Sequence, residues 1–403
     1  MLCPISGWSG AAQTTPHYNR LVPDVFILGI ETSCDETAAA VVRSGEEVVS
    51  NVVYSQIATH QPYGGVVPEL ASREHLRAIV PVVRKALQDA DRSYETIDAL
   101  AVTKGPGLAG ALLVGLSYAK SLAYAVNKPL IGVNHLEGHI HAVLLEVRQN
   151  GGNRELQFPV LALVVSGGHT HLYLATRNAT TWEYHDVGHT RDDAAGEAFD
   201  KVAKLLDLGY PGGPIIDFLA KHGNSRAVKF SFAQIKHPDR NPQNRHAAGQ
   251  QRIDFSYSGM KTAVLRYVET HDMRAAIEKR RRQLAGIANP APEDILAACD
   301  PQTLDLVASF QRAMVDDLVG KTLLAAREHN IATVLVTGGV AANSELREAF
   351  EIRAAEEGLA VRFPSRQLST DNAAMIAAAA YPRFVAGESS DAELSADPAL
   401  KLR

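Results

Sequence analysis

The sequence is poor in cysteine. Its three cysteines, Cys3, Cys34 and Cys299, lie far apart and form no C-x-x-C pair. This spacing predicts neither a disulfide framework nor a thiolate metal site. Such cysteine usage suits a reducing, cytoplasmic setting.

Two further absences narrow the class of protein. No apolar run approaches the roughly 20 residues that span a bilayer, so no membrane partner is expected. The net charge of −5 argues against broad, non-specific nucleic-acid binding and leaves room only for a local basic patch. Residues 1–24 contain one basic residue, Arg20, and no strong apolar region, so we expect a flexible extension. Import into an organelle stays an alternative with little support, because transit peptides normally carry more arginine.

Two patterns occur twice in the chain, in the same order. Residues 25–42 and 159–176 each contain an apolar run, a polar turn and a second run of small and β-branched residues, as expected for two strands joined by a tight loop. Residues 97–123 and 331–350 each contain a strand pattern, a glycine turn and a helix pattern. Gly-rich turns are common in any α/β fold, but four in this order predict two similar α/β lobes around a nucleotide-binding cleft. Backbone N–H groups in such turns bind phosphate.

The boundary between the lobes is expected at a polar, Gly-containing linker near residue 155. This divides the chain into an extension (1–24), a first lobe (25–157) and a second lobe (158–403). An Ala-rich helix from about residue 371 is a candidate to pack back on the first lobe. Polar or Pro-rich stretches at 233–253 and 280–303 are interpreted as insertions.

The stretch HLEGHIH (135–141) contains candidate metal ligands. His135 and His139 are four apart, so on a helix both side chains lie on one face and can reach one ion. A zinc protease requires H-E-x-x-H, whereas here the carboxylate of Glu137 is two positions after His135, about 200° around the helix. A distant third ligand is needed, and Asp371, beside a predicted helix start, is a candidate. The alternatives are two polar helix-surface histidines and an Asp371 that merely caps a helix.

Polar groups near the glycine turns are candidate nucleotide ligands. Consecutive N–H groups at Ser166, Gly167 and Gly168 suit a phosphate or carbonyl oxygen. Asn343 follows a second glycine turn, where it can bind a ribose or a base edge. Asp200 and Asp217 flank the Pro-Gly-Gly turn at 211–213, and such carboxylates often bind ribose hydroxyls. Solvated helix carboxylates are the alternative interpretation.

Taken together, these motifs resemble the tRNA threonylcarbamoyladenosine biosynthesis transferase family, once described as O-sialoglycoprotein endopeptidases. The resemblance extends from about residue 26 to residue 388. It is carried by long strings in order: GIETSCDETAAAVV, YGGVVPELASREHL, GPGLAGALLVG, NHLEGHIHA, LVVSGGHTHL, DDAAGEAFDKVAKLLDLGYPGGP, DFSYSGMKTAV, TGGVAANSELR and STDNAAMIA.

The resemblance implies an actin/sugar-kinase-like bilobal fold and a metal-dependent acyltransferase. It implies that His135, His139 and Asp371 hold one metal ion per subunit, Fe²⁺ in this family, from two helices on opposite walls of the cleft. From the ligand types alone, zinc stays open. The positions that match the family's adenylate-binding residues are Val164, Val165, Ser166, Gly167, Gly168, Asp200, Gly213, Asp217 and Asn343.

The implied reaction transfers a threonylcarbamoyl group from threonylcarbamoyl-AMP to N6 of the tRNA adenosine just 3′ of the anticodon, and releases AMP. Asp35 or Glu36, on the first hairpin turn, is expected to accept a proton from the attacking amine. Bacterial members work with a paralogous partner subunit and a small ATPase, whereas mitochondrial members act without them. Two other functions remain alternatives: a metalloprotease, and an ATPase or kinase with the same bilobal fold.

Overall fold

The computed structural model describes residues 24–150, 156–178, 181–232, 253–287 and 289–403. The extension expected at 1–24, except Asp24, therefore lies outside the described residues. So do the insertion expected at 233–253, except Ile253, and residues 151–155 beside the expected lobe boundary.

The first sheet is built from the N-terminal third of the chain. Its strand order is β3-β2-β1-β4-β5, in which β1 pairs antiparallel with β2 and parallel with β4. Most residues of β1 and β2 are buried, because helices cover both faces of the sheet, and both strands are accordingly rich in Ala, Val and Ile. The strands are β1 (Phe26–Glu31), β2 (Glu36–Arg43), β3 (Glu47–Ser55), β4 (Ala99–Gly105) and β5 (Leu130–Asn134).

The second sheet repeats this topology. Its order is β10-β9-β6-β7-β8, so an antiparallel three-stranded meander is again followed, on the other side of its first strand, by two parallel strands. The repeat confirms the predicted pair of similar α/β lobes and the actin/sugar-kinase-like fold class. The strands are β6 (Val160–Val165), β7 (Thr170–Asn178), β8 (Thr181–His189), β9 (Thr333–Thr337) and β10 (Ala360–Arg362).

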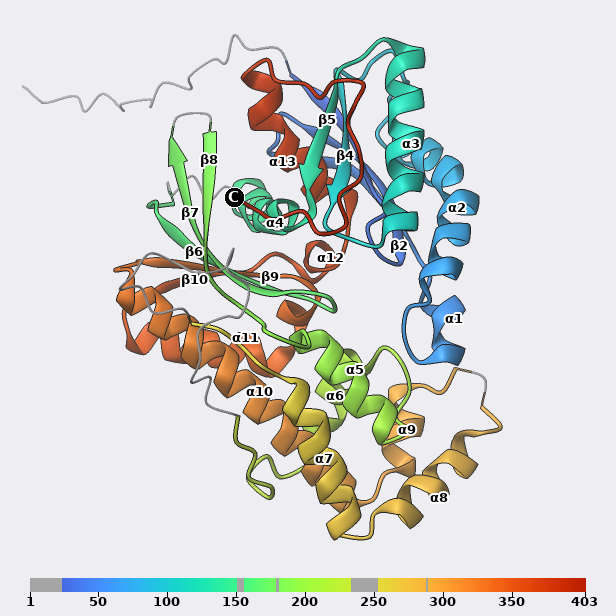
Figure 1. Ribbon diagram of the computed structural model, residues 1–403, viewed down its shortest axis with the longest axis vertical. Coiled ribbons are helices and arrows are strands. Elements are labelled where there is room, and N and C mark those ends of the chain that lie inside the picture. The colour runs from blue at the N-terminus through green and yellow to red at the C-terminus, as the bar shows by residue number, and fades with distance from the viewer. Residues whose placement is uncertain (1–23, 151–155, 179–180, 233–252, 288) are drawn as a thin grey trace, which may run out of the picture.

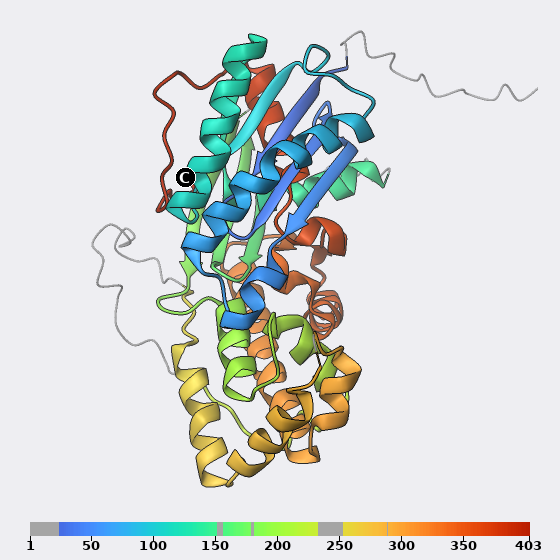
Figure 2. The same cartoon turned by 90° about the vertical axis from the view of Figure 1, so that its right-hand side faces the viewer.

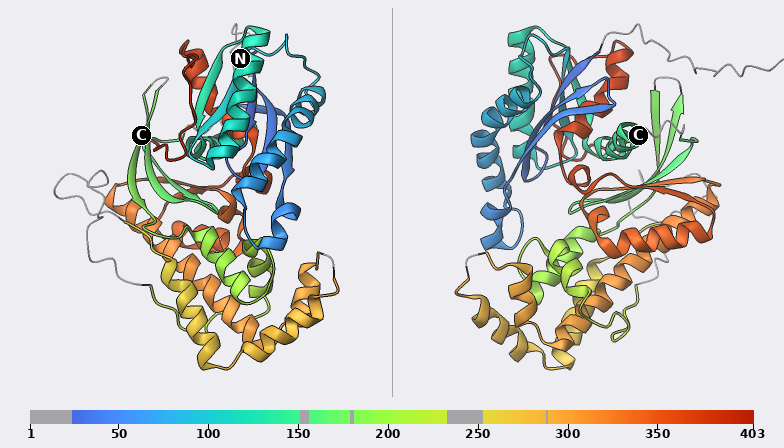
Figure 3. Two further views of the ribbon diagram at one scale, coloured as in Figure 1. Left: turned by 45° about the vertical axis from the view of Figure 1, so that its right-hand side comes forward. Right: turned by 180° about the vertical axis from the view of Figure 1, so that it is seen from behind.

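Two helix pairs cover the first sheet (Figures 1 and 2). On one face lie α2 (Pro68–Asp89) and α3 (Ala109–Val126), preceded in the chain by α1 (Ile57–His60) and η1 (Gln61–Tyr63). On the other lie α4 (His135–Gln149) and α13 (Ala373–Val385), which follows all the strands of the second sheet in sequence (Figure 3). A run of buried alanines lets α13 approach closely, and a Cβ built on Gly29 of β1 would lie 2.3 Å from the Ala373 carbonyl oxygen.

The helix α3 is the only one among the described residues that is long and apolar enough to cross a membrane. It has 18 residues. The expectation that no apolar run approaches the roughly 20 residues that span a bilayer is therefore wrong. It packs against α2 and β4 in the first lobe, and 33% of its residues are buried.

The helices of the second lobe form its larger core below the second sheet (Figure 1). The expected insertion at 280–303 is largely helical and lies at the far end of the molecule, where buried Arg280 donates to the Leu206 carbonyl at 2.6 Å. The helices are α5 (Ala195–Leu205), α6 (Gly212–Ala220), α7 (Ser258–Thr270), α8 (Arg274–Leu284), α9 (Pro292–Ala298), α10 (Pro301–Glu328), η3 (Gly339–Ala342), α11 (Ser344–Glu356) and α12 (Arg366–Ser369).

The helix α4 joins the two lobes. Its Leu136 and Ile140 belong to an apolar cluster that also contains Val160 and Val164 of β6. The side chains of α4 that do not face the first sheet are therefore also buried, and all residues from His135 to Leu145 are inaccessible to solvent or nearly so.

Candidate metal centre and substrate site

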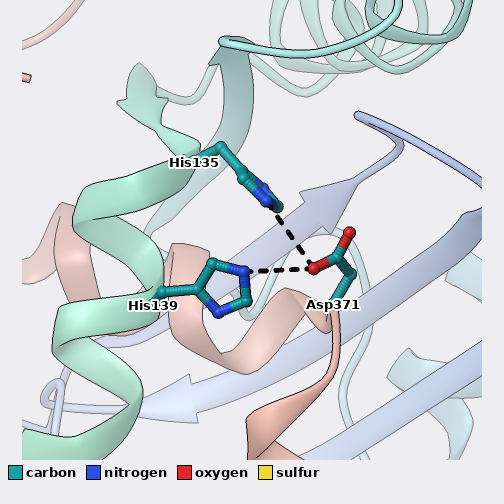
Figure 4. Close-up of side chains that lie close together, drawn as sticks. All are labelled: His135, His139 and Asp371. Carbon is teal, nitrogen blue, oxygen red and sulfur yellow. Dashed lines mark ion pairs between the residues drawn. The ribbon is translucent and has the colours of Figure 1, made fainter. Parts of the chain in front are cut away.

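Two histidines and an aspartate meet at the start of α4. The strand β5 ends at Asn134, whose side chain caps the helix by accepting the Leu136 N–H at 2.9 Å. The cap starts the helix at His135, so His135 and His139 lie one turn apart on the same face (Figure 4). Oδ1 of Asp371 lies 3.6 Å from Nε2 of His135 and 3.1 Å from Nε2 of His139.

The expectation that the ligands come from opposite walls of a cleft is wrong. Asp371 precedes α13, and α13 packs beside α4 on the same face of the first sheet. The capping role that competed for Asp371 is taken by Asn372, which accepts the Met375 N–H at 3.1 Å. The carboxylate of Asp371 is thus left to face the two histidines.

The electrostatics of this cluster favour charged forms. Burial alone would lower the pKa of His135, but the carboxylates of Asp371 and Glu31 raise it to about 9. Burial alone would raise the pKa of Asp371, but His135 and His139 hold it well below its usual range. These shifts follow from the short distances between the imidazoles and the carboxylates.

The donor set fits a single metal ion. One ligand atom from each of His135, His139 and Asp371 lies within 4.8 Å of the other two. The imidazole of His139 is fully buried; Nδ1 has no hydrogen-bond partner among the described residues, and Nε2 faces Oδ1 of Asp371 at 3.1 Å. Imidazole nitrogens and a carboxylate oxygen are donor types that one metal ion would take together.

Glu31 is a member of the site that the sequence analysis missed. It is the last residue of β1 and is fully buried, with Oε2 3.0 Å from Nδ1 of His135. The available signal was a carboxylate at the end of an otherwise apolar strand, just before the turn that carries Asp35 and Glu36.

The turn after β6 brings the second lobe to this cluster. The N–H of Ser166 donates to the His169 carbonyl, and the imidazole of His169 lies 6.0 Å from that of His135. A Cβ built on Gly167 or Gly168 would meet nothing within 4 Å. Of the predicted segment, Val164 and Val165 end the strand inside the core, and Ser166, Gly167 and Gly168 form the turn.

A hydrogen bond joins Asp200 to the Pro-Gly-Gly segment that contains Gly213. Oδ1 of Asp200, on α5, accepts the N–H of Gly212, so Gly213 falls in the first turn of α6. Burial, opposed by the hydrogen bonds from Gly212 and Gly213 and assisted by the charge of Asp35, raises the pKa of Asp200 to about 6. Asp35, from the first lobe, therefore contributes to the electrostatic environment of a carboxylate in the second lobe.

Asp217 and Asn343 belong to one network at the start of α11. Asp217 accepts the Ser344 hydroxyl at 2.8 Å. Asn343 caps α11 by accepting the Leu346 N–H and donates its amide to Gln311, which in turn donates to Asp217. Each predicted side chain thus already has protein partners. Gln311, which joins them, was not predicted.

Asp35 lies on the first hairpin turn, and Glu36 is the first residue of β2. Burial, followed by the charges of Asp35 and Asp371, raises the pKa of Glu36 well above its usual value. Burial, followed by the charges of Asp35 and Asp200, also raises the pKa of Tyr210, an unpredicted neighbour from the second lobe. The raised pKa favours the protonated form of Glu36, which cannot accept a further proton.

Comparison with known proteins identifies the family. The profile described as tRNA N6-adenosine threonylcarbamoyltransferase matches residues 47–378. The chain belongs to the tRNA N6-adenosine threonylcarbamoyltransferase family. A relative of that name from Koribacter versatilis is 72% identical over 94% of this chain and 100% of its own. One from Clostridium botulinum (strain Kyoto / Type A2) is 46% identical over 94% of this chain and 98% of its own.

Among solved structures, component A of the Acidaminococcus fermentans (R)-2-hydroxyglutaryl-CoA dehydratase matches with a TM-score of 0.46 and 13% identity. The match covers 90% of this chain and 99% of that one.

In this chain, Glu137 is not arranged as a protease base. It is 3% exposed and pairs with Arg383 of α13 at 2.7 Å. His141 is fully buried and lies 3.3 Å from the Tyr184 hydroxyl. Both residues are buried. The carboxylate of Glu137 is paired with Arg383, so it is not placed to activate a water as a protease base would.

Proposed function

We propose that this chain transfers the threonylcarbamoyl group from threonylcarbamoyl-AMP to N6 of the tRNA adenosine next to the anticodon, and that AMP is the leaving group. The observation that carries the proposal is the cluster of His135, His139 and Asp371 beside the turn at Ser166–Gly168. Membership of the family supports it.

The metal ion is held by His135, His139 and Asp371, and we propose Fe²⁺, with Zn²⁺ as the ion that the same donor types also suit. When bound, the ion supplies Lewis-acid polarisation of substrate oxygens.

The chain's own residues bind and orient the adenylate. The N–H groups of Gly167 and Gly168 donate to its phosphate or acyl oxygens. Asp200 and Asp217 accept ribose hydroxyls, while Asn343 contacts the ribose or the base and Gly213 leaves room for the nucleotide.

The reaction is an acyl transfer from a mixed anhydride, so the leaving group is already good. The N6 amine attacks the carbamoyl carbon, a C–N bond forms, and the bond from that carbon to the phosphate oxygen breaks. The amine loses one proton, which Asp35 accepts, with Glu36 as the alternative acceptor. The amine attacks the carbamoyl carbon directly and displaces AMP from it, so no covalent enzyme intermediate is needed.

The test is reconstitution of the modification. Purified protein, its bacterial partner proteins, unmodified tRNA and enzymatically made threonylcarbamoyl-AMP should give modified adenosine and AMP in equal amounts. Asp371→Ala should abolish both. Cleavage of a protein substrate, or ATP hydrolysis or phosphoryl transfer without modified tRNA, would favour the metalloprotease or the ATPase/kinase alternative.

The paralogous partner subunit is proposed to dock on the helix pair α2 and α3, and a small ATPase completes the assembly in the cytoplasm. The supporting observation is a groove of about 490 Å³ lined mainly by apolar side chains of these helices, among them Leu76, Val80 and Leu113. Tyr124 of α3 is 92% exposed nearby. Exposed apolar patches of this kind mark protein interfaces.

The docking proposal has a matched control. Leu113 on α3 and Ile352 on α11 are both 54% exposed. Leu113→Glu should prevent co-elution with the purified paralogous subunit, and Ile352→Glu should not. Equal co-elution of both variants would remove α2 and α3 as the docking surface.

A further inference from the structure

We infer that Glu31 is a positioning residue for the metal centre: it orients the imidazole of His135 so that Nε2, and not Nδ1, faces the ion. The inference rests on the proposed metal centre. Glu31 itself is not placed as a ligand, because among the described residues the metal-ligating cluster consists of His135, His139 and Asp371.

The carboxylate of Glu31 is held at both oxygens. Oε1 accepts the N–H of Ser33, and Oε2 accepts the hydroxyl of Thr103 on β4 at 2.6 Å. Oε2 also lies 3.0 Å from Nδ1 of His135. The group is fully buried, so water does not compete for these contacts. Glu31 therefore has a fixed position at the junction of β1, β4 and α4.

This arrangement selects one tautomer of His135. An ionised carboxylate only accepts hydrogen bonds, so the proton of a neutral imidazole is held on Nδ1. The lone pair then lies on Nε2, which points toward Asp371 at 3.6 Å. Carboxylate partners of this kind orient metal-ligating histidines and raise their basicity as ligands.

Ser33, the other residue in contact with Nδ1 of His135, cannot fix the tautomer. The hydroxyl of Ser33 lies 3.1 Å from the same nitrogen, but a hydroxyl both donates and accepts. Nδ1 of His139 has no hydrogen-bond partner among the described residues. Orientation by a buried carboxylate is thus confined to one of the two histidines, and Glu31 is the residue that supplies it.

A purely structural role for Glu31 is the competing explanation. Its bond to Thr103 links β1 to β4, so Glu31 could simply stabilise the sheet. Two substitutions separate these roles. Ser33, Thr103 and His135 all present donors to the two oxygens of Glu31. Glu31→Gln replaces one of these oxygens with an NH₂ group, which donates and so cannot accept from them. Ser50→Ala removes a buried hydrogen bond of the same lobe, from the Ser50 hydroxyl to the Ala86 carbonyl at 2.7 Å, and leaves every contact of Glu31 in place.

The experiment measures Co²⁺ binding to the full-length, metal-free protein by visible absorption in competition with a chelator. We expect Glu31→Gln to weaken Co²⁺ binding by about 10- to 100-fold and to change the absorption bands of the complex. Ser50→Ala should lower the thermal midpoint of the metal-free protein and leave Co²⁺ affinity within about threefold of the wild type, because Glu31 and the three ligands keep their contacts. Unchanged affinity in Glu31→Gln, or an equal loss in Ser50→Ala, would overturn the inference.

A second measurement does not depend on a variant that folds. In the Zn²⁺-loaded wild-type protein, ¹⁵N shifts of the His135 ring should report a proton on Nδ1, and a proton on Nε2 would overturn the inference. Asp371→Ala separates the two levels of the argument. If Asp371→Ala binds Co²⁺ as tightly as the wild type, the metal centre itself fails. If only Glu31→Gln does so, the centre stands and the role of Glu31 falls.

Discussion

Nε2 of His139 lies 3.1 Å from Oδ1 of Asp371, although one residue precedes the second sheet in sequence and the other follows it. The contact exists because the last long helix, α13, returns to the first lobe and packs beside α4. The candidate metal centre is consequently built on one face of one sheet, and the second lobe supplies the turn beside it.

Replacement of His139 by alanine should remove the metal from the protein. Three protein donors become two, which is too few to retain an ion against a chelator. Metal analysis of protein purified without oxygen should show about one ion per wild-type chain and at least tenfold less in His139→Ala. A chelator should lower the thermal midpoint of the wild type and not that of the variant. His185→Ala, on an exposed histidine of β8, is the control and should bind metal normally.

Binding of adenosine should weaken as the pH falls through about 6, the pKa of Asp200. Ribose hydroxyls donate to the ionised carboxylate of Asp200. Below this pH the carboxyl group must first lose its proton, so affinity falls by up to about tenfold for each pH unit. Adenosine is the suitable probe, since it has no phosphate that titrates in this range. Isothermal titration between pH 5 and 7 measures the effect. A pH dependence that persists in Asp200→Asn would assign it to another group.

Gly29→Ala should disturb both stability and the metal centre. The new Cβ would lie 2.3 Å from the carbonyl oxygen of Ala373, so α13 must move away from β1. Overpacking of this kind costs about 1–3 kcal/mol of unfolding free energy. Since Asp371 directly precedes α13, Co²⁺ affinity should fall as well.

The matched control for this substitution is Gly259→Ala on α7, where a Cβ would meet nothing within 4 Å. It should be neutral or slightly stabilising in denaturant unfolding, because alanine favours a helix more than glycine does. A loss of stability in Gly29→Ala with unchanged Co²⁺ affinity would show that the position of Asp371 does not depend on α13.

Arg383→Ala should destabilise the protein by about 3–5 kcal/mol at neutral pH, because it leaves Glu137 buried without its partner. Burial already raises the pKa of Glu137, and Arg383 opposes that shift. With the folded-state pKa of Glu137 raised further, the penalty is complete above that raised pKa, shrinks as the pH falls toward the ordinary pKa of a glutamate, and is absent below it.

Urea unfolding at pH 7 and pH 4.5 measures this dependence. Arg73→Ala removes the exposed ion pair with Glu69 and should cost less than about 1 kcal/mol at either pH. An equal, pH-independent loss in both variants would contradict a role for the buried charge.

Much of the site was predictable from short sequence patterns. The spacing of His135 and His139 sets their common face wherever a helix forms, and Asn134 starts that helix. The glycine turns at Ser166–Gly168 and after β9 follow from apolar strands that end abruptly. The repeated order of these patterns was enough to predict two similar lobes, because strand pairing in a hairpin is local.

The remaining features depend on packing between distant segments. The position of α13 beside α4 joins Asp371 to the histidines. The sequence offered the return of this helix to the first lobe as a candidate, whereas the family resemblance implied ligands on opposite walls. The contact of Glu31 with His135, and the pair of Glu137 with Arg383, likewise join residues far apart in the chain. Sequence by itself determined the candidate ligands and the secondary structure that presents them, since both follow from neighbours within a few residues. Only the tertiary structure decided which carboxylate faces which imidazole, because that choice follows from how buried surfaces fit together.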